Sequence, residues 1–222
     1  MSISHKLQSF WTALTSRLNS GGQWIPPFFI RLILFWEFYE AGTQKLNGKN
    51  WFTGIQDNFP WPFNHIPADV SWFMAAWGEY LFAILLLLGL FTRFAAISLL
   101  VITAVATAAV HWPDSYSSLS QLWDGYAISN KGAGNFKLPL LFIILLLPLV
   151  FSGAGKLSMD HLLTKLTGND TSHPITSDFI SKGLVLIVLG LPLFFVMPTL
   201  GIALLVLGVL LVFFDRFITP NG

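Results

Sequence analysis

Three glutamates lie inside long apolar stretches of this sequence, where a charge is least expected. Glu37 and Glu40 lie in one stretch and Glu79 lies in the next. A carboxyl group inside a bilayer is costly unless it is paired or hydrated, so each intramembrane glutamate is a candidate functional group. Such groups can carry protons, bind a metal ion or hold a polar head group. The alternative is that paired or protonated carboxyls only lock helices together.

A histidine and a lysine extend this set of polar residues. His111 ends the third apolar stretch, and Lys45 follows Glu40 by five residues. Because consecutive membrane helices run in opposite directions, Glu40, Glu79 and His111 fall at similar depth in the outward half of a bundle. We therefore predict a polar cluster of Glu37, Glu40, Lys45, Glu79 and His111. Carboxylate and imidazole groups also make Glu40, Glu79 and His111 a candidate metal-ligand set, whereas His111 taken alone is typical of an interfacial histidine.

The composition indicates that these residues belong to a membrane protein. Of 222 residues, 54% are hydrophobic and 10% are charged, against about 25% charged in a typical soluble domain. A formal net charge of +1 provides no basic face for nucleic acid. The chain has no cysteine, which excludes disulfides, thiolate metal sites and Cys-X-X-Cys redox chemistry. No phosphate loop, zinc-protease motif or nucleophile elbow is present, which favours an accessory membrane subunit over an enzyme and leaves catalysis open.

Apolar stretches of membrane-spanning length predict six helices. The uncharged stretch 183–214 would reach about 48 Å as one helix, well beyond a hydrocarbon core of about 30 Å. Pro198 offers a break, so we predict two helices there; one tilted, proline-kinked helix is the alternative. The predicted fold is an all-α integral membrane protein, with a four-helix bundle and a C-terminal two-helix hairpin. The predicted spans are 28–46, 71–91, 94–112, 134–153, 179–196 and 199–216.

The chain divides into four predicted parts. They are an amphipathic interfacial helix (1–25), a four-span core (26–155), a cytoplasmic amphipathic connector (156–178) and a transmembrane hairpin (179–222). A weakly attached tail is the alternative for the first part. Lys and Arg are more frequent on the N-terminal side of the predicted membrane, which places both termini in the cytoplasm of a bacterial inner membrane. The aromatic loops 47–70 and 113–131 then face outward.

The order of several short motifs resembles the DoxX family of small membrane proteins. In that family a Gly-X-X-Lys-Leu element closes the first span, and a Glu precedes an aliphatic run, Gly-Leu and Arg in the second. A Gly-X-Gly-X-X-Ser-X-Asp element follows the fourth span. The matching residues here are Gly42, Lys45, Leu46, Glu79, Gly89, Leu90, Arg93, Gly153, Gly155, Ser158 and Asp160. We predict that Arg31 and Trp112 are structural residues of the same core.

A narrower resemblance is to the HvfX branch of the DoxX family. It rests on residues 40–46 followed by Trp51-Phe52, on the proline-aromatic loop 59–63, and on His111-Trp112 at the end of the third span. The resemblance implies an inner-membrane accessory factor in the maturation, export or metal handling of a copper-binding ribosomal peptide. Its implied partners are the lipid bilayer, a cysteine-rich copper-binding peptide and the iron-dependent enzyme that modifies this peptide.

Two other functions stay open. Other DoxX-like proteins are similar to membrane subunits of quinone-linked redox complexes, so the implied cofactor is copper or a quinone. Intramembrane carboxylates also fit a proton-coupled transporter of small solutes.

Overall fold

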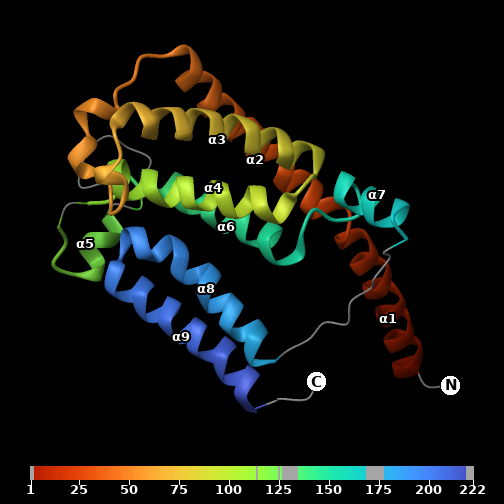
Figure 1. Cartoon of the computed structure of the whole chain (residues 1–222). Helices are drawn as coiled ribbons and strands as arrows, with labels where there is room; N and C mark the ends of the chain where they lie inside the picture. Colours follow the sequence, from red (N-terminus) through yellow and green to blue (C-terminus); the bar gives the residue numbers. More distant parts are fainter. Residues whose placement is uncertain (1–2, 114, 125, 127–134, 169–177, 219–222) are drawn as a thin grey trace.

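The computed structural model of the chain consists of helices joined by loops (Figure 1). It describes residues 3–113, 115–124, 126, 135–168 and 178–218. The helices are α1 (Ile3–Gly22), α2 (Ile25–Asn47), α3 (Ala68–Leu88), α4 (Thr92–Ala106), α5 (Leu119–Asp124), α6 (Lys137–Ser152), α7 (Met159–Leu166), α8 (Phe179–Val196) and α9 (Pro198–Ile218). Three short 3₁₀ turns, η1 (Phe52–Gly54), η2 (Gln56–Asn58) and η3 (Phe63–His65), lie between α2 and α3, and a π-helical segment, η4 (Thr107–His111), continues α4.

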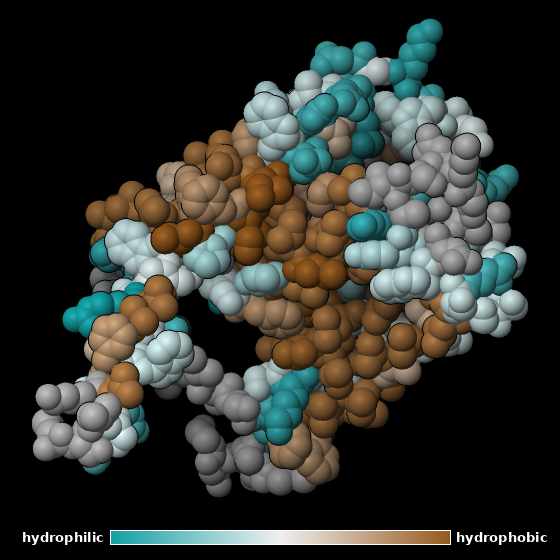
Figure 2. All heavy atoms as spheres, turned by 180° about the vertical axis from the view of Figure 1, so that it is seen from behind, coloured by the Kyte–Doolittle hydropathy of each residue, from teal (hydrophilic) through white to brown (hydrophobic). Residues whose placement is uncertain are grey.

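Within the described part of the chain, four helical segments are long and apolar enough to cross a membrane. They are α3, α4 together with η4, α8 and α9. Helix α6 is apolar but has 16 residues, and α2 has 23 residues but carries four charged side chains. Seen from behind, apolar residues form a broad band over the middle of the molecule, and hydrophilic residues gather toward its ends (Figure 2). The expectation of an all-helical, multi-pass membrane protein is confirmed.

The uncharged C-terminal stretch folds as two helices rather than one. Helix α8 ends at Val196 and α9 begins at Pro198, because proline lacks the N–H that a continuous helix would need there. The two helices pack side by side as an antiparallel hairpin (Figure 1). The ring of Phe195 in α8 contacts that of Phe63 in η3, with centroids 5.9 Å apart, which joins the hairpin to the η1–η3 loop.

Helices α2, α3, α4 and α6 form a four-helix bundle. Helix α2 packs along α3, and α4 packs along α6 (Figure 1). At Gly42 of α2, an added Cβ would lie 2.6 Å from the Tyr80 backbone nitrogen and 3.0 Å from the Ala76 carbonyl oxygen. Any larger side chain would push the two helices apart, so Gly42 sets their spacing.

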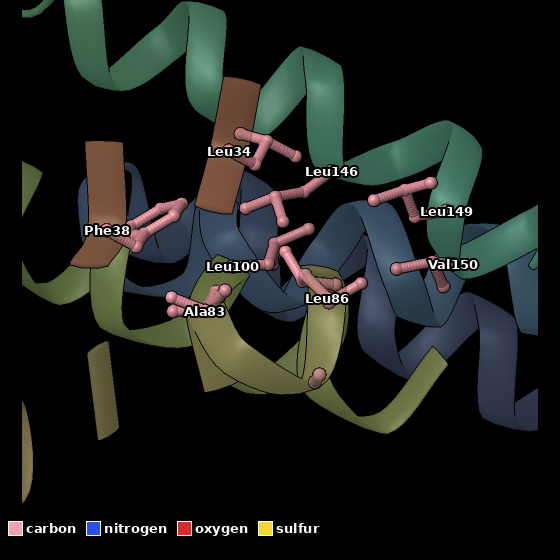
Figure 3. Close-up of a cluster of buried hydrophobic side chains, with 11 residues drawn as sticks. Leu34, Phe38, Ala83, Leu86, Leu100, Leu146, Leu149 and Val150 are labelled. Atoms are coloured by element: carbon pink, nitrogen blue, oxygen red, sulfur yellow. The ribbon is translucent and has the colours of Figure 1, made fainter. Parts of the chain in front are cut away.

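The half of the bundle nearest α7 contains a densely packed hydrophobic core, and we call it the packed half. Side chains from α2, α3, α4 and α6 point toward one another there (Figure 3). Leu34, Leu86 and Leu146, each from a different helix, are all 0% exposed. Dense packing of this kind leaves no room for a ligand.

A buried arginine ties α2 to the α3–α4 turn at the same end. Arg31 is 1% exposed. Its guanidinium donates to the carbonyl oxygens of Leu86 and Leu87, at 3.1 Å each, and to that of Leu157. Gly89 lies in the turn with φ +63°, and an added Cβ would lie 2.5 Å from a guanidinium nitrogen of Arg31. Glycine is therefore needed both for the left-handed backbone and for the space that Arg31 fills.

Asp160 of α7 holds the start of α4. The backbone N–H groups of Phe91 and Thr92 donate to its carboxylate at 2.8 and 3.0 Å. The N–H of Asp160 itself donates to the Gly89 carbonyl oxygen at 2.9 Å. These bonds satisfy N–H groups that the first turn of a helix leaves unpaired.

The other family-motif residues at this end terminate helices. Arg93 donates to two carbonyl oxygens in the last turn of α6, at 2.6 and 2.9 Å. Gly153 is the C-cap of α6, and Ser158 is the N-cap of α7. The Ser158 hydroxyl donates to the Gly155 carbonyl oxygen at 2.6 Å. Together these residues join α6 and α7 to the α3–α4 turn.

Helix α1 lies outside the four-helix bundle. It runs away from the packed half, close to α7 (Figure 1). Its apolar side chains Leu7, Phe10, Trp11 and Leu18 are between 63% and 65% exposed. An amphipathic helix with an uncovered apolar face suits a membrane interface, and this placement of residues 1–25 stays a prediction.

Two predicted segments are described only in part. Helix α7 belongs to the predicted connector 156–178, of which residues 169–177 lie outside the described residues. The predicted outward loop 113–131 contains α5, which was not predicted, and its residues 114, 125 and 127–131 lie outside the described residues.

Candidate functional site

The half of the bundle nearest η1–η3 encloses a cavity of about 730 Å³, and we call it the hollow half. Its walls come from α2, α3, α4 with η4, α6 and the loop that contains the 3₁₀ turns. Most of the lining is aromatic or aliphatic, as at Phe63, Val101, Ile102 and Leu138. A cavity of this size and character suits a largely apolar small molecule.

Aromatic side chains bound the cavity toward both ends of the bundle. Phe38 and Phe142, whose ring centroids are 5.5 Å apart, separate it from the packed half. Phe52 and Phe59, whose ring centroids are 5.0 Å apart, are 6% and 7% exposed and cover it on the loop side.

Exposed lining residues occur in the loop, at Trp51 (48% exposed), and on the helices of the bundle. Met74, Val110 and Leu138 belong to three different helical segments and are 50%, 46% and 43% exposed. The cavity wall therefore includes residues that are exposed on the surface of the bundle, where a membrane protein can meet lipid.

An ion pair between α2 and α3 forms one polar group in the cavity wall. Lys45 Nζ lies 2.6 Å from Glu79 Oε2, and the two side chains are 18% and 8% exposed. The two helices approach closely enough for this pair because Gly42, one turn before Lys45, lacks a side chain. Pairing offsets part of the cost of placing the two charges away from water.

A histidine–asparagine pair forms a second polar group. Nδ1 of His111 lies 2.5 Å from Oδ1 of Asn135, and both residues line the cavity. Since an amide oxygen only accepts hydrogen bonds, Nδ1 is the donor of this pair, and in a neutral imidazole Nε2 is then the acceptor nitrogen. His111 ends the π-helical segment η4, a local widening of the helix that is frequent at functional sites. Trp112 follows it and packs on Phe136, with ring centroids 5.0 Å apart.

Ser71 supplies a third polar group. Its side chain lines the cavity, the residue is 7% exposed, and its Oγ has no hydrogen-bond partner. A buried hydroxyl without a partner is costly, so the position favours a ligand that completes its hydrogen bonding. Ser71 and Asn135 were not predicted. Ser71 precedes Glu79 by eight residues, a spacing that places both on one helix face and was the available signal.

The predicted polar cluster is assembled only in part. Glu37, Lys45, Glu79 and His111 all line the cavity. Glu40 is exposed and does not line it; its Oε1 accepts a hydrogen bond from Gln44 Nε2 at 3.1 Å. The expected place of Glu40 was wrong because inward-facing positions of α2 include Phe38, and a residue two positions later points to the opposite side of a helix.

The predicted metal-ligand set is not brought together. Because Glu40 faces away, Glu79 and His111 lack the third ligand that was expected. No group of three or more His, Cys, Asp or Glu side chains that could hold a metal ion occurs within residues 3–113, 115–124, 126, 135–168 and 178–218. The described polar groups of the hollow half offer hydrogen bonding and charge pairing at the wall of a largely apolar space.

Comparisons with known proteins agree with the motif analysis. Residues 27–112 match the family model described as DoxX. An uncharacterized protein of Haemophilus influenzae (strain ATCC 51907 / DSM 11121 / KW20 / Rd) is 43% identical over 150 residues, which cover 68% of this chain and 91% of that protein. No solved structure matches the chain.

Proposed function

This chain belongs to the DoxX family of membrane proteins, and from that premise we propose that it is a membrane redox subunit that binds a quinone-type lipid. The observation that carries the proposal is the cavity of about 730 Å³, apolar in most of its lining and polar at a few fixed points. A quinone combines the same two properties, because its ring carries polar carbonyl oxygens and its tail is apolar.

The residues present fit such a group. The Lys45 ammonium can donate to a carbonyl oxygen while it stays paired with Glu79. The unpartnered hydroxyl of Ser71 offers a further donor. Aromatic walls such as Phe52 and Phe142 fit the face of a planar ring. The apolar tail would leave between the helices toward lipid, where Met74 and Leu138 are exposed.

Each polar residue would have a defined task in this site. Lys45 and Ser71 bind and orient the head group, and Glu79 holds the Lys45 side chain in position. Asn135 holds the ring of His111 through Nδ1, and Nε2 of a neutral imidazole would accept a hydrogen bond from an O–H of the reduced, hydroquinone form. When bound, the quinone supplies two-electron redox chemistry for a partner enzyme.

Ligand binding tests the proposal directly. The protein is purified in mild detergent, and its lipids are extracted and separated by chromatography. A short-tailed quinone is then titrated while the tryptophan fluorescence is followed, in the wild type and in Trp51→Phe, because Trp51 lines the cavity and its share of the quenching is the difference between the two. We expect co-purified quinone and saturable quenching. Because Glu79 holds Lys45 in position, Glu79→Gln should weaken the hydrogen bond from Lys45 to the head group and raise Kd several-fold, where a ten-fold change in Kd corresponds to about 1.4 kcal/mol.

The matched control is Glu40→Gln, the same change on the outward face of α2. It should leave Kd unchanged. A folded wild-type protein that contains no quinone and binds none would remove the proposal, and so would equal effects of the two substitutions.

We also propose the membrane arrangement predicted above. In it α2 and α6 cross the bilayer together with the four candidate spans, residues 26–155 form the core, and residues 179–222 form the hairpin. Residues 1–25 lie at the membrane surface, residues 156–178 connect core and hairpin, and both termini are cytoplasmic. Because the chain has no cysteine, Lys49→Cys and Lys165→Cys each introduce a single thiol. A membrane-impermeant maleimide added to intact spheroplasts should label only the first.

Handling of a copper-binding peptide is the second candidate, and the order of its HvfX-like motifs favours it. A copper site would then have to lie mainly on the peptide, since the described residues of this chain provide no group of three ligands. Titration of purified protein with Cu(I), with and without a cysteine-rich precursor peptide, separates the two candidates. Binding of the peptide but not of quinone would replace the first proposal with the second.

A further inference from the structure

The side of α2 that faces away from the bundle carries a row of exposed residues in which a carboxyl group lies among aromatic and aliphatic side chains. The row consists of Phe29, Ile33, Trp36, Glu40 and Asn47, and we call it the α2 outer face. Separations of four, three, four and seven residues keep these residues on one side of a helix. Phe29, Ile33 and Trp36 are 53%, 51% and 67% exposed. The buried residues of α2 lie on its other side, against α3 and α6.

The carboxyl group of this face lies at the depth of the bilayer interior when α2 crosses the membrane as proposed. Gly42, two residues after Glu40, faces Ala76 and the backbone of Tyr80, close to the midpoint of the candidate span α3. Glu40 is therefore exposed where the surroundings would be hydrocarbon, an unfavourable place for a carboxylate without a partner. The inference below rests on this crossing of α2 and is independent of which ligand the cavity holds.

The described part of the chain offers Glu40 no cation. Its Oε1 accepts a hydrogen bond from the uncharged amide of Gln44 at 3.1 Å, and no ion pair to it occurs among the described residues. The cations of α2 itself lie on the inward side of the helix. Arg31 is buried against carbonyl oxygens, and Lys45 is paired with Glu79. The complementary charge for Glu40 has to come from another molecule.

A second copy of this chain does not supply that charge. Its own α2 outer face would present the same carboxyl group. Helix α3 has no Lys or Arg, and those of α4, α6 and α8 lie in the first turn of each helix, away from its middle. The stretch 183–214, which forms most of the α8–α9 hairpin, has no charged residue. Charge complementarity therefore favours a different chain as the occupant of this face.

We propose that the α2 outer face is the docking surface for a membrane-spanning helix of a different protein, which carries a Lys or Arg in its middle. The basic side chain of that helix pairs with Glu40. The separations of four, three and four residues between Phe29 and Glu40 are those of helices that pack side by side.

The pair removes an unfavourable exposure from both helices. A Lys or Arg in the middle of a membrane helix is costly in lipid, as a carboxylate is, and such residues occur paired with one another. Trp36 lies one turn before Glu40, so its ring is available for a cation–π contact with the same basic group. Phe29 and Ile33 continue the face toward the packed half and offer apolar surface to the rest of the partner helix.

A model helix tests this recognition. The probe is a Leu–Ala peptide of membrane-spanning length with one central Lys, and the matched peptide has Leu at that place. The protein carries a donor fluorophore at Lys49→Cys, its single thiol, and energy transfer to the labelled peptide is measured in phosphatidylcholine vesicles. We expect the Lys peptide to bind at least about ten-fold more tightly than the Leu peptide, because a desolvated charge pair couples two chains strongly.

The preference for the Lys peptide should disappear in Glu40→Gln. The control is Asp57→Asn, the same loss of a carboxylate at an exposed position in η2, and it should keep the preference. Equal binding of the two peptides to the wild type, or equal effects of the two substitutions, would overturn the proposal. Quinone titration of the same Glu40→Gln protein should give the wild-type Kd, so this inference and the quinone proposal can fail separately.

Cross-linking identifies the occupant in native membranes. A photoreactive benzophenone amino acid replaces Trp36 on the α2 outer face, or Leu207 (48% exposed) on α9 as the control. After irradiation, the cross-linked segment is sequenced. At Trp36 we expect a membrane span of a different chain with a Lys or Arg in its middle, and at Leu207 no cross-link to that chain. Cross-linking at Trp36 to a second copy of this chain, to a span without a basic residue, or to lipid alone would each contradict the proposal.

Discussion

The packed half and the hollow half of the bundle consist of the same four helices, but their buried polar groups have different surroundings. In the packed half, Arg31 donates to backbone carbonyl oxygens, and the Asp160 carboxylate accepts from backbone N–H groups. In the hollow half, the Lys45–Glu79 pair, the His111–Asn135 pair and Ser71 all border a cavity. The first set holds helix ends together, and the second set is available to a ligand.

This difference divides the family-motif residues into two groups. Gly89, Arg93, Gly153 and Asp160 lie in the packed half or at its end. Arg93 and Asp160 bond there to backbone groups of neighbouring segments, and Gly89 and Gly153 lie against arginine side chains. Lys45 and Glu79 meet in the hollow half. The residues of the family motif therefore include both structural residues and candidate site residues. Only the surroundings of each side chain distinguish the two kinds.

The largest expected effect is that of removing the buried guanidinium. Arg31→Met should lower the free energy of unfolding by about 4 kcal/mol, because three carbonyl oxygens lose a charged donor in a buried site. Denaturation in mixed micelles, followed by tryptophan fluorescence, measures this loss. Arg17→Met on exposed α1 is the control and should change stability by less than about 0.5 kcal/mol. Similar losses for both variants would show that the packed half does not depend on Arg31.

A smaller loss of stability is expected when a buried leucine side chain is shortened. Leu86 is 0% exposed (Figure 3), and Leu86→Ala should cost about 3 kcal/mol. Ile102→Ala should cost about half as much, since Ile102 already borders the cavity and loses fewer contacts. Comparison of the two unfolding free energies in the same micelles tests whether the two halves are packed differently. Equal losses would contradict the distinction.

The positions of the helices along the sequence could be predicted more readily than which face of each helix points into the bundle. Apolar length and Pro198 were sufficient for the long apolar helices and for the break in the hairpin, but not for the short helix α5. The inward face of α2 was not readable, because aromatic and charged residues occur all around this helix, and Glu40 was placed on the wrong side. Asn135 was missed because its role depends on His111, which is distant in sequence. The cavity follows from how four helices pack, which no single stretch of sequence encodes.

Two buried hydroxyls without hydrogen-bond partners allow a comparison of the two halves in which a smaller effect is expected. Ser71 lines the cavity, whereas Thr92 is 0% exposed in the turn at the packed end. Ser71→Ala and Thr92→Val should each leave stability unchanged or raise it by up to about 1 kcal/mol, because each removes a buried group without a partner. Quinone titration should distinguish them, with Kd raised several-fold for Ser71→Ala and unchanged for Thr92→Val. A lower affinity in both variants would mean that polar groups of the packed half also affect the ligand.

The smallest effect is expected where a polar group is exposed. Asp178 caps α8 outside the predicted span: the Ser181 backbone N–H donates to its carboxylate at 2.7 Å, and this bond lowers the pKa of Asp178 below its ordinary value of 3.8. Because the pKa is lower in the folded state, the stabilisation is present above pH 3.8 and is lost as the pH falls through the folded-state pKa. Hydrogen exchange in the first turn of α8, corrected for the intrinsic rate, should therefore increase in acid. The control is Asp178→Asn, which keeps a capping group without a charge. In this variant the corrected hydrogen exchange of the first turn of α8 should not change with pH. An equal increase of exchange in acid in both proteins would show that the response does not come from the Asp178 carboxylate.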